Sequence, residues 1–325
     1  MIMRKKRIII FLIGILIFSF FLLFSDVFWD KKENEIYDIS IIINSETSES
    51  WKIVKQGIDQ ATIEMNINTS FITLSKERSV EEQSALIERE INSGADAILI
   101  APVDYEKMTE SIEEAITKVP IVLIESNINS NKGLNYISCE NYELGIKLAE
   151  EVTKNKNERS EIVIIKNGLE VSSIRERYEG FTDTIKISGS NYTFIEFSND
   201  DNLEYNKVKK ILEEKKVDVV VSFDASTLEL VGEAKKDLNK SKDKNIDVEI
   251  YGVGSTRTIL PLLEDGTINS IGVQNEFNIG YLGIEKALDI LNGEKIKKST
   301  IESTIVTSTN MYSKENQRLL FPFIR

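Results

Sequence analysis

The sequence predicts an α/β protein whose strands form two separate, mainly parallel sheets. Short and almost wholly apolar runs recur along the chain, such as ISIII, AILIA and VVV. Runs of this kind are typical of strands that are buried on both faces of a parallel sheet. Segments with helical spacing of apolar residues lie between them, which is the order expected of βαβ units. About eleven strands are expected, and because single sheets of that width are uncommon, two lobes with one sheet each are favoured.

The elements alternate regularly along the chain. Strands are predicted at residues 37–44, 69–74, 97–101, 120–124, 134–138, 161–165, 192–197, 217–223, 247–253, 268–273 and 299–306. Helices are predicted at 50–65, 80–91, 142–153, 172–187, 203–215, 227–238, 258–264 and 277–291, with a further helix ending at 117. Ser79 and Glu82 fit a capping box that opens the second of these helices. The polar stretch 239–247 is predicted to be a surface loop.

A basic cluster and a hydrophobic run open the chain. Residues 4–7 are RKKR, and the uncharged run 8–24 that follows lies at the lower limit of length for a helix that spans a bilayer. The basic cluster is expected to stay in the cytoplasm, so the rest of the chain is predicted to face outward, with Trp29 at the interface. We therefore expect a membrane anchor at 1–30 and a charged linker at 31–35. A cleaved signal peptide is the alternative, although small residues of the A-x-A kind are missing and no Cys follows the run.

The composition excludes several classes of function. The net charge of −13 argues against nucleic acid as a partner, because phosphate binding needs a basic surface. The chain has no His and one Cys, so it lacks the usual residues for Ser-His-Asp or Cys-His catalysis and for zinc binding. Cys139 is predicted to be a small buried hydrophobic residue. We expect a binding protein without a cofactor or metal rather than an enzyme.

Polar residues follow four of the predicted strands at the point where each strand ends. They are Asp104, Glu125, Asp224 and Gln274. Ligands of open parallel sheets bind beyond the carboxyl ends of the strands, so these side chains are candidates for contact with a small polar ligand. For Asp104 and Asp224, a role as the N-cap of the following helix is an equally simple interpretation.

An ordered series of segments resembles a known family. The series comprises the opening Trp51-x5-Gly57, then ADAILIAPVD, VPIVLIES, SSIRERYEGF, VVVSFD, EIYGVGST and TINSIGVQNEFNIGYLGI. In this order they are similar to the type I periplasmic sugar-binding proteins, the ribose-binding-protein-like group. The resemblance implies two Rossmann-like lobes joined by three crossings, with the ligand between them. The implied boundaries are 36–124 plus 276–298 for the first lobe, 125–274 plus 299–310 for the second, crossings near 125–127, 274–275 and 298–300, and a tail at 311–325.

The resemblance also implies a ligand site. Arg175 matches a family Arg whose planar fork donates to neighbouring hydroxyls, whereas Arg177 and Glu176 are expected to form surface pairs. Trp51 matches an aromatic residue that packs on the sugar ring, with a buried core Trp as the alternative. The expected ligand-binding residues are Ser48, Trp51, Asp104, Glu125, Arg175, Asp224 and Gln274.

Two departures bear on the ligand. Where the family has an Asp after the strand that reads IYGV, this chain has Gly254 and Ser255, so one hydroxyl acceptor is missing. A second aromatic residue expected after FIEFS is also absent, so the resemblance does not identify the ligand as ribose. It implies a small sugar-like ligand. The expected anchor, with no Cys for a lipid anchor, favours a sensor in which closure of the lobes signals the ligand to a membrane histidine kinase. The alternative is the solute-binding subunit of an ABC-type sugar importer with its permease as partner.

Overall fold

The computed structural model describes residues 13–15, 19, 36–44, 49–155, 160–197, 201–214, 216–242, 246–294 and 300–321. The chain divides into two compact units, Met1–Tyr37 and Asp38–Arg325, and the second holds every element discussed below. The predicted anchor and linker lie outside the described residues, apart from 13–15 and 19. In the described part of the chain, no helix combines the length and apolar character that a membrane crossing requires.

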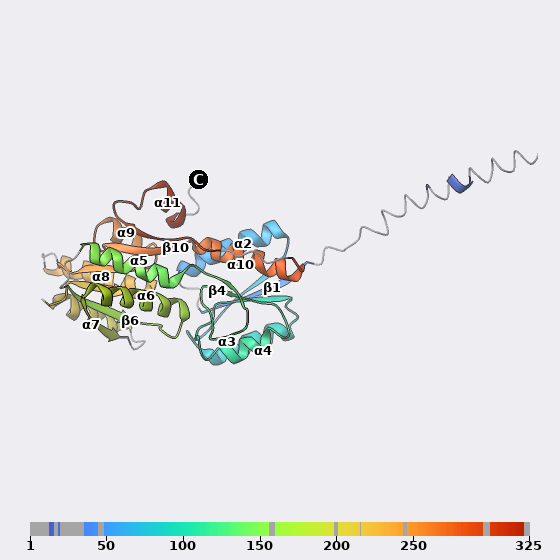
Figure 1. Cartoon of the computed structure of the whole chain (residues 1–325), viewed down its shortest axis with the longest axis horizontal. Coiled ribbons are helices and arrows are strands. Elements are labelled where there is room, and N and C mark those ends of the chain that lie inside the picture. The colour runs from blue at the N-terminus through green and yellow to red at the C-terminus, as the bar shows by residue number, and fades with distance from the viewer. Residues whose placement is uncertain are drawn as a thin grey trace, which may run out of the picture. The chain divides into compact units, whose positions relative to one another are not determined.

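The first lobe is built on a five-stranded parallel sheet with the order β2-β1-β3-β4-β5. Helices α3 and α4 pack below this sheet in Figure 1, and α2 and α10 lie together above it. Strands β1, β3 and β4 are almost completely buried, as their apolar runs predict. The elements are β1 (Asp38–Ile43), α2 (Glu49–Met65), β2 (Asn68–Thr73), α3 (Val80–Asn92), β3 (Ala97–Ile100), α4 (Thr109–Ala115), β4 (Ile121–Ile124), β5 (Asn135–Ile137) and α10 (Glu276–Leu291).

The second lobe is built on a six-stranded sheet with the order β11-β10-β9-β8-β6-β7. Its strands are parallel except β11, which runs antiparallel to β10. Helices α5 and α6 form a close pair, with α5 against β9, β10 and β11, while α8 packs on β8 and β9 beside α7 and α9 (Figure 1). The elements are α5 (Asn141–Asn155), β6 (Glu161–Lys166), α6 (Ser172–Ser188), β7 (Asn191–Glu196), α7 (Asp201–Glu213), β8 (Val219–Ser222), α8 (Ala225–Lys242), β9 (Glu249–Val253), α9 (Ile259–Glu264), β10 (Ser270–Gln274), β11 (Ser303–Thr307) and α11 (Lys314–Leu320).

The structure differs from the predicted boundaries in three places. Strand β5 pairs with β4 in the first sheet, although the expected boundary at 125 assigned it to the second lobe. Helix α8 continues to Lys242, four residues into the predicted loop. Helix α11 lies in the stretch 311–325 that was expected to be only a tail, because Leu319 and Leu320 are buried in the core of the second lobe.

The predicted capping box forms only in part. Ser79 caps α3 by accepting a hydrogen bond from the backbone N–H of Glu82. The Glu82 carboxylate does not return this contact to Ser79. It accepts instead from the backbone N–H groups of Ser75 and Lys76 and from the Ser75 hydroxyl, so it orders the loop before the helix.

Candidate functional site

A cavity of about 250 Å³ lies between the two lobes, at the carboxyl ends of the strands. Both lobes contribute to its wall, as expected for a ligand site in an open α/β fold. The polar and aromatic residues that line it are Asn44, Ser50, Trp51, Glu77, Arg78, Glu125, Ser126, Ser173, Arg177, Asp224, Ser226, Ser255, Gln274 and Glu276.

An ion pair and an amide join the lobes at one side of this cavity. Glu125 follows β4 in the first lobe, and its Oε1 accepts from Arg177 Nη2 at 2.9 Å. Its Oε2 accepts from Gln274 Nε2 at 3.1 Å. Arg177 also donates from Nε to Asn141 Oδ1 at 2.7 Å and from Nη1 to the Phe223 carbonyl at 3.3 Å. These contacts fix the guanidinium in a buried position at the cavity wall.

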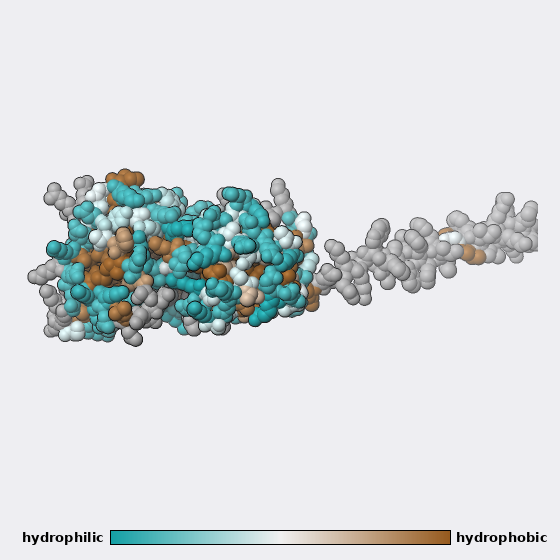
Figure 2. Space-filling view, turned by 90° about the horizontal axis from the view of Figure 1, so that it is seen from below, coloured by the Kyte–Doolittle hydropathy of each residue, from teal (hydrophilic) through white to brown (hydrophobic). Residues whose placement is uncertain are grey.

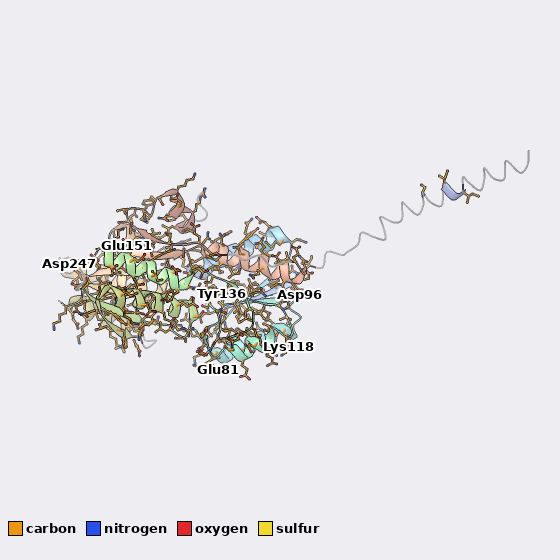
Figure 3. The ribbon with its side chains drawn as sticks, in the orientation of Figure 1. Glu81, Asp96, Lys118, Tyr136, Glu151 and Asp247 are labelled. Carbon is orange, nitrogen blue, oxygen red and sulfur yellow. The ribbon has the colours of Figure 1, made fainter. Side chains whose placement is uncertain are left out.

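The backbone of Glu125 adopts a conformation that side chains rarely take. Its φ is 63°, in the left-handed region. The Glu125 carbonyl accepts from Tyr136 Oη and Ser138 Oγ, each at 3.0 Å, and its N–H donates to the Ile137 carbonyl. Figure 3 shows Tyr136 at the junction of the lobes, where burial raises its pKa above the ordinary value. These contacts from β5 hold the carboxylate at the cavity wall against the local strain.

The other side of the cavity is formed by the starts of two helices. Trp51 is half-buried in the first turn of α2 and lines the cavity, so it is not a fully buried core residue. Glu276 is the first residue of α10, and the hydroxyl of Ser50 hydrogen-bonds to its carboxylate. Burial, with Glu125 and Glu49 nearby, raises the pKa of Glu276 to about 7, although Ser50 and Arg177 oppose the shift.

Several polar atoms of the cavity wall lack a partner. Among the described residues, four buried side-chain oxygen or nitrogen atoms make no hydrogen bond, and three of them belong to cavity residues. These three are Asp224 Oδ2, Gln274 Oε1 and Glu276 Oε2. Buried polar groups are nearly always hydrogen-bonded in folded proteins. Two of the atoms are carboxylate oxygens and one is an amide oxygen, so the cavity is suited to a molecule that presents several hydrogen-bond donors.

The structure brings together some of the predicted site residues and separates others. Trp51, Glu125, Asp224 and Gln274 all line the cavity. Asp224 also takes the alternative role predicted for it, because its Oδ1 accepts from the N–H of Thr227 and from Ser226 Oγ in the first turn of α8. The sequence position of Ser48 lies outside the described residues.

Asp104 and Arg175 do not line the cavity. Asp104 Oδ1 accepts from the backbone N–H groups of Glu106 and Lys107, so it caps the turn that precedes α4, whose own N-cap position is Met108. Arg175 lies over the ring of Tyr105, with 3.8 Å from the guanidinium to the ring centre.

The prediction that Arg177 forms a surface pair is wrong, because its side chain is 5% exposed and reaches the cavity. Side chains two residues apart on a helix leave it in directions about 200° apart. Only one Arg of the Arg-Glu-Arg triplet can therefore face inward. Of the two arginines, Arg177 and not Arg175 therefore lines the cavity.

One further cavity residue, Glu276, was not predicted from the sequence. Glu276 lies three residues after the end of the predicted strand 268–273, and the acceptor pattern of the family gave no reason to single it out. The missing Asp after β9 has a local explanation: Gly254 has a φ of 141°, and a Cβ there would lie 2.7 Å from the Cβ of Ala225. No residue with a side chain fits at that position without displacing α8.

Comparison with protein families and curated sequences gives a consistent result. Residues 39–295 match the family model described as "Periplasmic binding protein domain". The ribose import binding protein RbsB of Bacillus subtilis is 23% identical over 273 residues, which cover 83% of this chain and 86% of that protein.

Solved structures show the same fold. A carbohydrate transporter solute-binding protein from Agrobacterium radiobacter, in complex with D-arabinose, has a TM-score of 0.81 at 24% identity and covers 89% of this chain and 100% of its own. A chain of the XylFII–LytSN complex has a TM-score of 0.74 at 22% identity, covering 84% of this chain and 98% of its own. With a family match over residues 39–295, the chain belongs to the periplasmic binding protein domain family.

Proposed function

We propose that this chain binds a small sugar in the cavity between its lobes and does not catalyse a reaction on it. The observation that carries the proposal is the set of unpartnered oxygens of Asp224, Gln274 and Glu276 in one cavity with Trp51. Sugar hydroxyls supply donors to such atoms, and the apolar CH face of a sugar ring suits an aromatic plane. The D-arabinose bound by a structurally similar protein supports the same class of ligand.

The two lobes contribute different parts of this interaction. Trp51 and Glu276 come from the first lobe, whereas Arg177, Asp224 and Gln274 come from the second. A ligand that contacts both sets binds most tightly when the lobes are closed on it. Because a ligand shifts a conformational equilibrium only through its different affinity for the two states, binding is expected to favour closure.

The binding function is tested by the melting temperature of the full chain in detergent. Our panel comprises D-ribose, D-arabinose, D-glucose, D-galactose and myo-inositol, because a ligand that binds only the folded state raises the melting temperature. One sugar is expected to give a clear rise, and Trp51→Ala is expected to lose it. Lys118→Ala, on an exposed position of the first lobe, serves as the control that keeps it. Absence of a rise with every sugar would contradict the proposed function.

We further propose that the bound state is read by a membrane histidine kinase on the extracytoplasmic side. Support comes from the basic cluster and apolar run at 4–24, which fit an N-terminal anchor with the binding lobes outside. The fold similarity to a chain of the XylFII–LytSN complex supports a role in a protein complex. Closure of the lobes changes the surface offered to such a partner, and this change is the signal in our proposal.

An importer subunit is the second candidate, because the B. subtilis relative is named as a ribose import binding protein. Deletion of the gene separates the two roles. If the chain is a sensor, sugar-induced transcription is lost while uptake of labelled sugar persists when the transporter is expressed independently. If it is an importer subunit, uptake itself falls under the same conditions.

A further inference from the structure

Glu276 lines the cavity but is not among the ligand-binding residues predicted from the sequence. It is the first residue of α10, its residue surface is 9% exposed, and its Oε2 makes no hydrogen bond. The carboxylate faces the same cavity as Gly254, where the acceptor expected after β9 is absent. The second lobe therefore lacks the one acceptor expected at Gly254, while the first lobe presents an unpartnered acceptor on Glu276.

Local geometry prevents the second lobe from supplying the missing acceptor itself. The left-handed φ of Gly254 and the closeness of Ala225 leave no space for a side chain there. Glu276 is held from the other lobe, because α10 packs tightly along α2 and the Asn275 side chain caps α10 through the N–H of Asn278. The Ser50 hydroxyl further fixes the carboxylate. The group is thus placed in advance rather than free to turn away.

We propose that Glu276 is a further ligand-binding residue of this cavity, where its carboxylate accepts a hydrogen bond from a sugar hydroxyl and replaces the acceptor that the second lobe lacks. The proposal rests on the proposed sugar-binding function and adds a residue that selects among ligands. It favours sugars with a free hydroxyl or amine towards α10. It disfavours sugar acids, because their carboxylate would meet an unpartnered carboxylate in a buried site.

The charged neighbours of Glu276 make this contact sensitive to pH. The groups that face it are Glu49 at the start of α2, Glu125 after β4 and Arg177 on α6, together with the Ser50 hydroxyl. Burial and the two acidic neighbours outweigh Arg177 and Ser50, so the pKa in the free cavity is about 7. A hydroxyl that donates to the carboxylate stabilises its charged form and lowers the pKa in the complex.

The direction of the pH dependence follows from this difference. Below the pKa of the free cavity, a bound proton must leave before the carboxylate can accept the hydroxyl. Affinity therefore rises with pH up to about 7 and is constant above it. If the pKa in the complex lies well below 6, the affinity at pH 6 is about tenfold weaker than at pH 8, because about one-tenth of the free protein is ionised there.

The test is calorimetric titration of the full chain with five sugars, namely D-ribose, D-arabinose, D-glucose, D-galactose and myo-inositol, and with the sugar acid D-glucuronate, at pH 6 and pH 8. For a sugar that binds, wild-type protein is expected to bind about tenfold more tightly at pH 8 than at pH 6, and to release about one proton on binding at pH 6 and almost none at pH 8. Glu276→Gln is expected to bind equally at both pH values, with no proton release. Glu285→Gln, on the same helix but outside the cavity lining, is the matched control and keeps the wild-type dependence.

The outcomes separate this inference from the proposed function. If a sugar binds but wild type and Glu276→Gln show the same affinity and pH dependence, the role of Glu276 is overturned and sugar binding stands. If glucuronate binds as tightly as D-glucose, the proposed selection against acids is overturned. If none of the five sugars binds at either pH, the proposed function fails and the inference fails with it.

Discussion

At the scale of single residues, the contact between Glu125 and Arg177 is the interaction on which the site most depends. Both charged side chains are largely shielded from solvent, and Glu125 also accepts a hydrogen bond from Gln274. Removing one partner of a buried pair leaves the other charge uncompensated, which costs more than the pair itself contributes. The pair is therefore a requirement of the closed site even if it adds little net stability.

Replacing each of the two neighbouring arginines by methionine, in separate variants, tests this view. Arg177→Met is expected to lower the free energy of unfolding by about 3 kcal/mol, because Glu125 and Asn141 lose their donor. Arg175→Met is expected to cost under about 1 kcal/mol, since its pair with Glu179 is long, at 3.8 Å, and partly exposed. Urea denaturation of both variants measures the difference. Equal losses would contradict the placement of Arg177 at the cavity.

The raised pKa of Glu276 also predicts a pH dependence of stability without any ligand. The folded state holds the proton more tightly than the unfolded chain, where the pKa is about 4.5. The stability that this group contributes is therefore complete below pH 4.5 and is lost as pH rises through about 7. At 1.36 kcal/mol for each pH unit between the two pKa values, the loss is at most about 3 kcal/mol.

Glu276→Gln removes this titration and leaves the other groups unchanged. The melting temperature of the variant relative to wild type is expected to rise between pH 5 and pH 8. Comparing the two proteins at each pH cancels the effects of Glu176 and Glu229, whose pKa values are also raised by burial. A constant difference across this range would show that the carboxylate is not buried in the free protein.

Sequence reasoning found the parts of the site that depend on strand ends and missed those that depend on helix orientation. Glu125, Asp224 and Gln274 follow buried strands, so sheet geometry alone places them at the cavity. Arg177 was missed because the choice between it and Arg175 depends on how α6 is rotated against α5. Asp104 also follows a strand, β3, but it does not line the cavity. A strand-end position is consistent with capping of the following turn as well as with ligand contact.

At the scale of elements, two helix pairs position the site by unusually close packing. A Cβ on Gly145 in α5 would overlap the carbonyl oxygen of Arg177 in α6, and one on Gly180 would overlap that of Tyr142. In the first lobe, a Cβ on Gly57 in α2 would overlap the carbonyl oxygen of Phe277 in α10. A Cβ on Gly280 in α10 would overlap that of Val54 in α2. The backbones can approach this closely only because no side chain lies between them. The first pair carries Arg177, and the second carries Trp51 and Glu276.

Gly145→Ala is therefore expected to move α6 away from α5 and to withdraw Arg177 from the cavity. Overpacking of this kind typically costs about 1–3 kcal/mol, and backbone contact at this site places the variant at the upper end. Sugar affinity is expected to fall together with the melting temperature. Gly133→Ala is the matched control, because a Cβ there meets no atom within 4 Å and its backbone has no positive φ. Equal behaviour of the two variants would contradict the role of the close pair.

The elements themselves were largely predictable, and the exceptions have physical causes. Continuous apolar runs gave β1, β3, β4 and β8, which are buried on both faces. Helix α11 was missed because it is short and its sequence KENQRLL is mostly polar. Only Asn316, Leu319 and Leu320 are buried, and tertiary packing rather than helical periodicity holds them in place.

At the scale of the whole binding unit, two further arginines join the lobes, Arg78 at the cavity wall and Arg257 outside the cavity lining. Arg78 Nη1, from the loop before α3, donates to Asn167 Oδ1 at 3.0 Å and to Glu170 Oε1 at 3.2 Å in the second lobe. Arg257 Nε of the second lobe lies 2.8 Å from Glu49 Oε1 of the first. Figure 2 shows a largely hydrophilic surface over the first lobe, with hydrophobic residues gathered over parts of the second. Because the contacts of Arg78 and Arg257 join the two lobes, closure depends on charged side chains as well as on the ligand.

Removing these two contacts is expected to open the lobes. Exposed or partly exposed pairs contribute about 0.5 kcal/mol each, so Arg78→Ala combined with Arg257→Ala shifts the closed-to-open ratio by about fivefold. The distance between lobes is measured by energy transfer between dyes on Lys118→Cys and Lys186→Cys, both exposed positions. The single native thiol does not interfere, because Cys139 is buried and burial raises its pKa to about 11.

Without sugar, the double variant is expected to show lower transfer efficiency than wild type. Its sugar affinity is expected to weaken by about the same fivefold factor, because part of the binding free energy is then used to close the lobes. High salt is expected to move the wild-type protein in the same direction, since it screens exposed pairs more than the buried pair of Glu125 and Arg177. The variant Lys236→Ala, whose partner Asp265 lies in the same lobe, controls for loss of a surface charge. If the double variant shows unchanged transfer, Arg78 and Arg257 do not hold the lobes together, and closure rests on the other contacts between the lobes.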